Sequence, residues 1–235
     1  MSRENRYTAI ILKKIPFNEG DEIITFFSLE QGKIRALAKS VKLQKSKLQA
    51  RLQGLFLVDV TLTTGGLPKI ISVEVEETFQ SLRENLPAMK LAFYAIELVL
   101  KFTPDEQKNE KLFQLLVHFL NFLNSDQNQE ILNLGLAKFK MEILNVLGLS
   151  IADDTSSAEV FFSPARGGFS GKKSAEGLTV SKVAYQAFLD LKTLDFMGLS
   201  TFNNSIGIHE LQNFLSGFIE YQLERKVKSE KYLKQ

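Results

Sequence analysis

Short runs of alternating apolar and polar residues fill the first third of the chain. Apolar side chains occupy every second position in residues 56–62, and the same alternation returns in residues 71–76. Three earlier runs are also rich in β-forming residues, and turn residues such as Gly, Pro and Asn separate them. The pattern therefore predicts five strands, at about residues 7–15, 23–29, 33–39, 56–64 and 70–76.

The number and length of these strands favour one architecture. Five short antiparallel strands in about 75 residues fit a small closed barrel of the OB type better than a sandwich of seven or more. After Pro87 the apolar residues recur at steps of three and four, which is the period of a helix. Further helical patterns cover about residues 110–124, 129–147, 181–195 and 207–228.

Together these patterns predict an α+β protein with two domains. An N-terminal five-stranded OB-fold β-barrel is expected in residues 1–80, and an all-α helical domain in residues 81–235. Residues 148–178 are rich in Gly, Ser, Asp and Lys, which breaks the helical pattern. This segment is predicted to be an irregular insertion in the helical domain.

Composition excludes several kinds of chemistry. The chain has no cysteine, so disulfides, thiolate zinc sites, iron–sulfur clusters and cysteine nucleophiles are excluded. The polar start of the sequence does not resemble a signal peptide. The longest charge-free apolar stretch, residues 112–125, is shorter than the ~20 residues that span a bilayer. A cytoplasmic protein is expected.

The net charge is only +2, but the positive charges are unevenly placed. Between Glu30 and Asp59 there is no acidic residue and there are seven basic ones: Lys33, Arg35, Lys39, Lys42, Lys45, Lys47 and Arg51. Alternation along residues 33–39 places Lys33, Arg35 and Lys39 on one face of a strand. The other four continue this basic track through a polar loop, as expected for a path that follows a phosphate backbone.

Two interpretations of this basic segment stay open. It predicts a nucleic-acid interface, with Tyr7, Phe17, Phe26 or Phe27 as candidates for base stacking. The alternative is an ordinary solvated face, since most charged residues simply stay at the surface. Most of the 19 phenylalanines are expected in the core.

The same region resembles the N-terminal signature of the RecO family of bacterial recombination mediators. The resemblance rests on the order of four short motifs: Glu19-Gly20-Asp21, Gln31-Gly32-Lys33, Ala38-Lys39 and Ser46-Lys47 in the basic loop. It extends through residues 7–147, and the rest of the chain is similar in layout.

The resemblance implies an OB barrel followed by a helical domain. It does not imply catalysis, and no cofactor is expected. It implies binding of single- and double-stranded DNA, strand annealing, and work with RecR, single-stranded-DNA-binding protein and RecA. The acidic, apolar tail of single-stranded-DNA-binding protein needs an apolar groove with a basic rim, which we expect in the helical domain.

Two departures from the family pattern matter. Many members carry a four-cysteine zinc module, whereas residues 150–178 lack cysteine, so we expect this segment to fold without zinc. Val160, Phe161, Phe162 and Phe169 are expected to hold it against the helices instead. Ser40-Val41 stands where members often have a glycine, so the turn into the basic loop is expected to differ.

Other candidate sites are weaker. Residues 166–173 lack the spacing of a phosphate-binding loop and of a nucleophile elbow, which favours a loop whose Arg166, Lys172 and Lys173 add at most a DNA contact. His118 and His209 are isolated in the sequence and are expected to be structural.

The sequence thus predicts a DNA-binding recombination mediator that is not an enzyme. The competing hypothesis is a protein–protein scaffold whose basic barrel binds an acidic partner surface. An enzyme acting on nucleic acid would need a metal-ligand cluster or a nucleophile arrangement, and the sequence offers neither.

Overall fold

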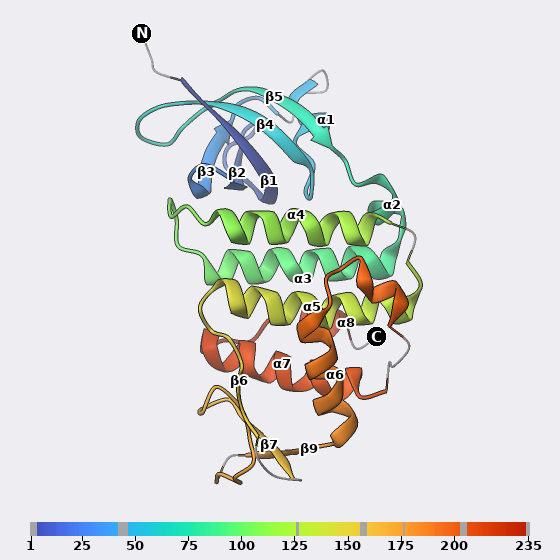
Figure 1. Ribbon diagram of the computed structural model, residues 1–235. Helices are drawn as coiled ribbons and strands as arrows, with labels where there is room; N and C mark the ends of the chain where they lie inside the picture. Colours follow the sequence, from blue (N-terminus) through green and yellow to red (C-terminus); the bar gives the residue numbers. More distant parts are fainter. Residues whose placement is uncertain are drawn as a thin grey trace.

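The computed structural model describes residues 4–41, 47–125, 127–155, 159–175, 177–202 and 206–233, apart from the side chains of Lys47 and Thr201. Figure 1 shows a barrel of strands at one end, a stack of helices in the middle and a small sheet at the other end. No helix in the described ranges is long and apolar enough to cross a membrane.

The barrel is built from five antiparallel strands. They are β1 (Glu4–Pro16), β2 (Glu22–Ser28), β3 (Gly32–Ala38), β4 (Leu57–Thr63) and β5 (Ile70–Glu77). Their order across the sheet is β3-β2-β1-β4-β5. The two edges of this sheet meet between β3 and the residues just before β5. There the Leu37 N–H donates to the Pro68 carbonyl at 2.7 Å, and Leu37 pairs in parallel with Lys69. This contact joins the two edges, and the predicted OB-type barrel is confirmed.

Alternation along the strands gives the barrel two apolar surfaces. One set of side chains fills its interior and includes Ile11, Phe26, Ile34, Val58 and Val60. A second set, on the outer face, belongs to the core of the helices and comprises Ile10, Leu12 and Phe27. The ring of Phe27 lies 6.2 Å from that of Phe113 in α4. The barrel and the helices therefore share a packed interface.

The helices begin close to the predicted domain division at residue 80. They are α2 (Gln80–Glu84), α3 (Leu86–Phe102), α4 (Glu110–Asn124), α5 (Gln129–Val146), α6 (Lys182–Thr193), α7 (Ile208–Leu223) and α8 (Glu230–Leu233), with a 3-10 turn at Gly198–Thr201. A short helix that the sequence pattern did not predict, α1 (Lys47–Arg51), separates β3 from β4 in the chain. In the stack, α4 lies next to the barrel and is followed by α3, α5 and α7 (Figure 1).

Local capping residues fix where several helices begin. Asn85, Asn109 and Asn128 precede α3, α4 and α5, and each side chain accepts a hydrogen bond from the backbone N–H three residues later. The predicted helix at 207–228 is too long, because Glu224 adopts a left-handed conformation with φ 52° and ends α7 at Leu223.

Residues 148–178 are more regular than predicted. Their described part holds the short strands β6 (Ala152–Asp154), β7 (Val160–Ser163) and β8 (Gly168–Ser170), which form a sheet with β9 (Leu178–Val180) in the order β6-β8-β7-β9. The expected packing against the helices is confirmed for Val160, Phe162 and Phe169, which belong to the same core as the helices, whereas Phe161 is buried but does not belong to that core. The ring of Phe162 lies 5.5 Å from Phe214 of α7, and that of Phe169 lies 4.7 Å from Phe188 of α6. The helical part of the chain is thus not purely α.

Candidate nucleic-acid interface

The basic residues of β3 lie on the outer face of the barrel, as their spacing predicts. Ile34, Ala36 and Ala38 point into the barrel core, which leaves Lys33, Arg35, Leu37 and Lys39 on the opposite face. This face is not uniformly exposed, however. One end of it meets the helices, and the loop before β5 buries Leu37.

Lys33 lies at the junction between the barrel and the helices. Its ammonium group donates to the carbonyls of Thr103 at 2.6 Å and Leu100 at 3.2 Å, which are at the C-terminal end of α3. It also pairs with Asp105 at 3.3 Å, and its side chain is only 13% exposed. A cation is favourable at this helix end, where carbonyls lack helical partners. The position favours a structural role for Lys33 over the predicted phosphate contact.

Gly32 allows the loop after α3 to dock against β3. Its φ is +74°, and a Cβ added at Gly32 would lie 2.0 Å from the carbonyl oxygen of Gln107. The Glu106 N–H donates to the Lys33 carbonyl at 2.8 Å beside this contact. We call the docked segment, residues 103–109, the junction loop.

Substitution of Gly32 by alanine should therefore weaken the junction. Left-handed backbone strain and the close backbone contact together should lower the free energy of unfolding by about 2–4 kcal/mol. Urea denaturation would measure the change. Gly54→Ala is the matched control, because nothing lies within 4 Å of the added Cβ there. Equal stability of the two variants would contradict this account of the junction.

Arg35 stands further along the same face. Its guanidinium donates to the carboxylate of Asp105 at 2.7 Å, and the two side chains are 61% and 44% exposed. Asp105 thus contacts both Lys33 and Arg35. Sequence reasoning did not predict this partner, because Asp105 lies 70 residues away from Arg35 in the chain.

The far end of β3 brings exposed residues of three segments together. Lys39 is exposed, and the next residue, Ser40, donates its backbone N–H to the carboxylate of Asp21 at 2.8 Å. That contact ties β3 to the β1–β2 turn, where the side chain of Phe17 is exposed. On the other side, the pairing of Leu37 with Lys69 brings in the β4–β5 loop. We call the exposed set Phe17, Lys39, Leu67 and Lys69 the barrel rim.

Of the four remaining basic residues, Lys42, Lys45, Lys47 and Arg51, the structure describes the side chain of Arg51 alone. Lys42 and Lys45 lie outside the described residues, and for Lys47 only the backbone, at the start of α1, is described. Arg51 ends α1, and its guanidinium donates to the Val73 carbonyl of β5 at 2.9 Å. Arg51 therefore helps to fasten α1 to the barrel.

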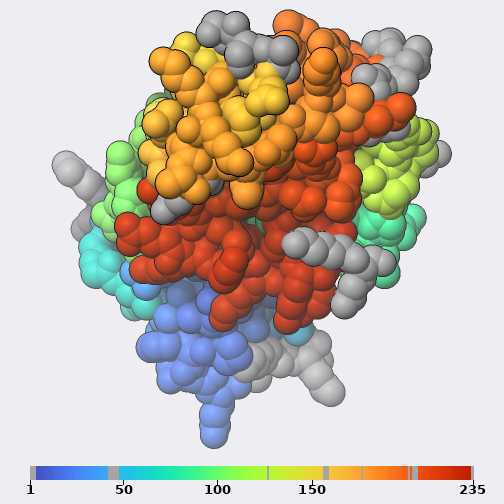
Figure 2. All heavy atoms as spheres, turned by 90° about the horizontal axis from the view of Figure 1, so that it is seen from below, coloured from blue at the N-terminus to red at the C-terminus, as the bar shows by residue number. Residues whose placement is uncertain are grey.

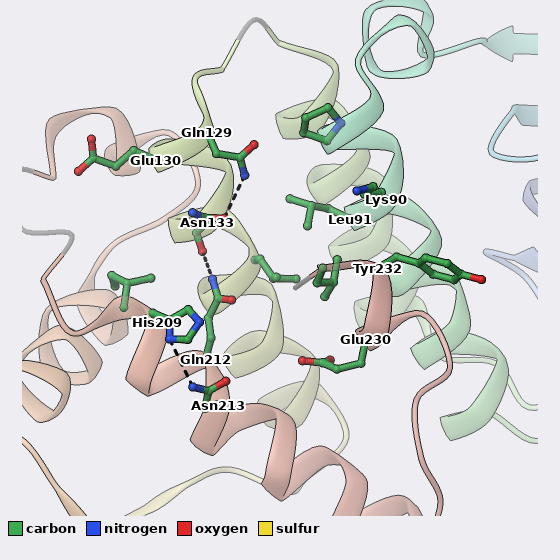
Figure 3. A pocket seen from close by; sticks show the side chains of 14 residues that line it. Lys90, Leu91, Gln129, Glu130, Asn133, His209, Gln212, Asn213, Glu230 and Tyr232 are labelled. Atoms are coloured by element: carbon green, nitrogen blue, oxygen red, sulfur yellow. Dashed lines mark hydrogen bonds between the residues drawn. The ribbon is translucent and has the colours of Figure 1, made fainter. Parts of the chain in front are cut away.

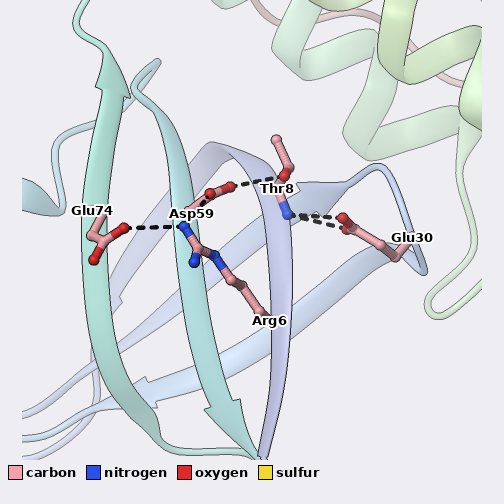
Figure 4. A network of polar contacts seen from close by, with 5 residues as sticks. All are labelled: Arg6, Thr8, Glu30, Asp59 and Glu74. Carbon is pink, nitrogen blue, oxygen red and sulfur yellow. Dashed lines mark hydrogen bonds and ion pairs between the residues drawn. The ribbon is translucent and has the colours of Figure 1, made fainter.

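Another face of the barrel is acidic (Figure 4). Arg6 pairs there with Asp59 at 2.6 Å and Glu74 at 3.1 Å, and the carboxylate of Glu30 accepts the backbone N–H of Thr8. The hydrogen bond to Asp59 raises the pKa of the Arg6 guanidinium, which stays charged. Because carboxylates outnumber cations in this network, it would repel a phosphate backbone.

Two hollows lie in the described surface of the helical part. One, of about 870 Å³, is bounded by α3, α5, α7 and α8, and Lys90, His209, Glu130 and Glu230 lie on its wall (Figure 3). Seen from the small-sheet end, the C-terminal part of the chain, drawn in red, covers the centre of the molecule (Figure 2). The second, of about 660 Å³, is more apolar and carries Phe122, Phe196 and Met197.

Neither hollow combines an apolar floor with a basic rim. The first carries carboxylates beside its lysine, and the lining of the second includes Asp195 and neither Lys nor Arg. The receptor for an acidic tail in the helical region stays a prediction. Over the described residues, no group of three His, Asp or Glu side chains is placed to hold a metal ion.

Comparisons with known proteins give a consistent result. "Recombination protein O N terminal" matches residues 1–79, and "Recombination protein O C terminal" matches residues 83–231. A DNA repair protein RecO from Synechococcus sp. (strain JA-2-3B'a(2-13)) is 27% identical over 98% of this chain and 89% of its own. The same-named protein of Pelotomaculum thermopropionicum is 28% identical over 96% and 91%. That of Bacillus cereus (strain AH187) is 30% identical over 71% and 69%.

Proposed function

The chain belongs to the recombination protein O (RecO) family of DNA repair and recombination proteins, and from this premise we propose that it binds DNA at the barrel rim. Lys39 and Lys69 contact phosphates in this proposal, and Phe17 offers a ring on which a base stacks. The single observation that carries the proposal is the convergence of the β3 end with two barrel loops.

The charge distribution supports this choice of surface. Lys33 and Arg51 already hold backbone carbonyls, and Arg35 is paired, so they are not the first contacts. In the sequence, Lys42, Lys45 and Lys47 follow Lys39 closely and continue the basic segment beyond it. The acidic network around Arg6 makes that other face unfavourable for DNA.

The proposed mechanism is electrostatic capture of a strand. Neutralising phosphates with lysines releases counterions, which drives binding without regard to sequence. The same neutralisation lowers the repulsion between two approaching backbones and so favours annealing of single strands and contact with duplex DNA. With RecR, the protein then helps to load RecA on DNA coated by single-stranded-DNA-binding protein. This role needs no catalytic residue and no cofactor.

Titration of fluorescent single-stranded DNA at several salt concentrations tests the proposal. In Lys39→Ala/Lys69→Ala, two phosphate contacts are lost, so the slope of log affinity against log salt should flatten by about 1.4. If the two proteins bind equally at 1 M salt, this change in slope lowers the affinity of the variant about 25-fold at 0.1 M salt, which is one decade lower.

A matched control separates the rim from overall charge. Lys182→Ala/Lys228→Ala removes the same charge from exposed lysines of the helical part and should change the slope by less than half as much. Weak wild-type binding that is insensitive to salt would contradict the proposal. That outcome would favour the scaffold hypothesis, in which the barrel binds an acidic protein surface.

A further inference from the structure

Asp105 places a negative charge on the basic face of β3. Its carboxylate lies 2.7 Å from the guanidinium of Arg35 and 3.3 Å from the ammonium of Lys33. Arg35 is the more exposed of these two cations, with 61% of its side chain accessible against 13% for Lys33. The more exposed cation, Arg35, is therefore already paired with a carboxylate of the protein itself, that of Asp105.

The backbone holds this carboxylate in position. The backbones of Lys33 and Asp105 pair as an isolated parallel β-bridge, and the Glu106 N–H donates to the Lys33 carbonyl. The junction loop is further fixed by the close contact of Gly32 with Gln107. Asp105 consequently meets Arg35 because the loop is docked, and not through a chance encounter of two flexible side chains.

We propose that Asp105 is an intramolecular substitute for a DNA phosphate on Arg35 and thereby limits the strength of DNA binding. This inference rests on the proposed function. A carboxylate and a phosphate both accept charge-assisted hydrogen bonds from a guanidinium, so they compete for it. The ion pair is exposed and contributes little to stability, so it does not prevent exchange.

The exchange explains how Asp105 lowers the gain from Arg35. When a phosphate takes Arg35, a counterion leaves the DNA, but Asp105, still paired with Lys33, stays beside the phosphate and offsets the positive charge that the site offers. The net release of ions is then close to zero. Removing the carboxylate turns Arg35 into an ordinary phosphate contact, whereas Lys33 stays bound to the two α3 carbonyls.

Asp105→Asn, which preserves the size of the side chain, is the direct test. Single-stranded DNA should bind about fivefold more tightly at 0.1 M salt, and the slope of log affinity against log salt should steepen by about 0.7. In an Arg35→Ala background the same substitution should change affinity by less than twofold. Asp154→Asn, which removes an exposed carboxylate in β6, controls for the change in net charge.

The outcomes separate this inference from the proposed function. Salt-dependent binding by the wild type with no gain in Asp105→Asn would overturn the inference alone. An equal gain with and without Arg35 would also overturn it, because the effect would then be long-range charge. If the wild type showed no salt-dependent binding, the proposed function itself would be contradicted, and this inference would fall with it. Asp105→Ser is the second variant, and unfolding temperatures close to the wild type establish that both are folded.

Discussion

Replacing Lys42, Lys45 and Lys47 together by alanine should flatten the salt dependence of single-stranded DNA binding by about 2. Each lost phosphate contact removes about 0.7 from the slope of log affinity against log salt, so affinity at 0.1 M salt should fall about 100-fold. The loss should be similar for all DNA sequences, because phosphate contacts position a strand without reading its bases. Fluorescence titration of several oligonucleotides at several salt concentrations would measure both effects.

A control for this variant needs the same change in charge away from the barrel. Lys182, Lys228 and Lys231 serve this purpose, because all three are exposed in the helical part. A folded loop variant with unchanged affinity and unchanged salt slope would remove the loop from the DNA path. The scaffold hypothesis would then gain weight over direct DNA binding.

Loss of the buried Lys140 should destabilise the protein more than loss of any surface charge. The Lys140 side chain is 1% exposed in α5, and its ammonium lies 2.6 Å from the Ser216 hydroxyl and 3.5 Å from the carboxylate of Glu230 in α8. It also lies 4.9 Å from the ring centroid of Tyr94. Burial raises the pKa of Tyr94, so its hydroxyl stays neutral beside this ion pair.

Lys140→Met leaves the carboxylate of Glu230 without its main positive partner. The free energy of unfolding should fall by about 3–5 kcal/mol, measured by urea denaturation. Lys140→Met/Glu230→Gln should recover a large part of this loss, because a buried pair also costs desolvation energy. Lys182→Met, at an exposed position, should change stability by about 0.5 kcal/mol or less. A double variant as unstable as Lys140→Met would show that the loss comes from packing.

The barrel could be predicted because its signal is local. Alternation in residues 56–62 and 71–76 matches β4 and β5, and the helical periods at 110–124 and 129–147 match α4 and α5. The strands β6 to β9 were missed because three or four residues carry too little alternation to distinguish a strand from a loop. The end of α7 depends on the backbone conformation of a single residue, Glu224, which no periodicity reveals.

The candidate interface was only partly predictable. Spacing correctly placed the cations of β3 on one face, but not which of them would meet the helices. Asp105 and Lys69 were missed because each reaches β3 only through the tertiary fold. The single available signal for Lys69 was its place directly after the Gly65-Gly66-Leu67-Pro68 turn.

The docked junction loop also has a mechanical consequence. The barrel is attached to the helices by more than the covalent link between β5 and α2, because Lys33 holds the end of α3 and Gly32 abuts Gln107. We therefore expect tension on a bound strand at the barrel rim to be carried into α3 through these contacts, and not to be taken up by bending at the link between β5 and α2. Because of these contacts the barrel and the helices form one packed unit, and if DNA binds at the barrel rim as proposed, we expect a partner bound to the helical surface to move with the DNA.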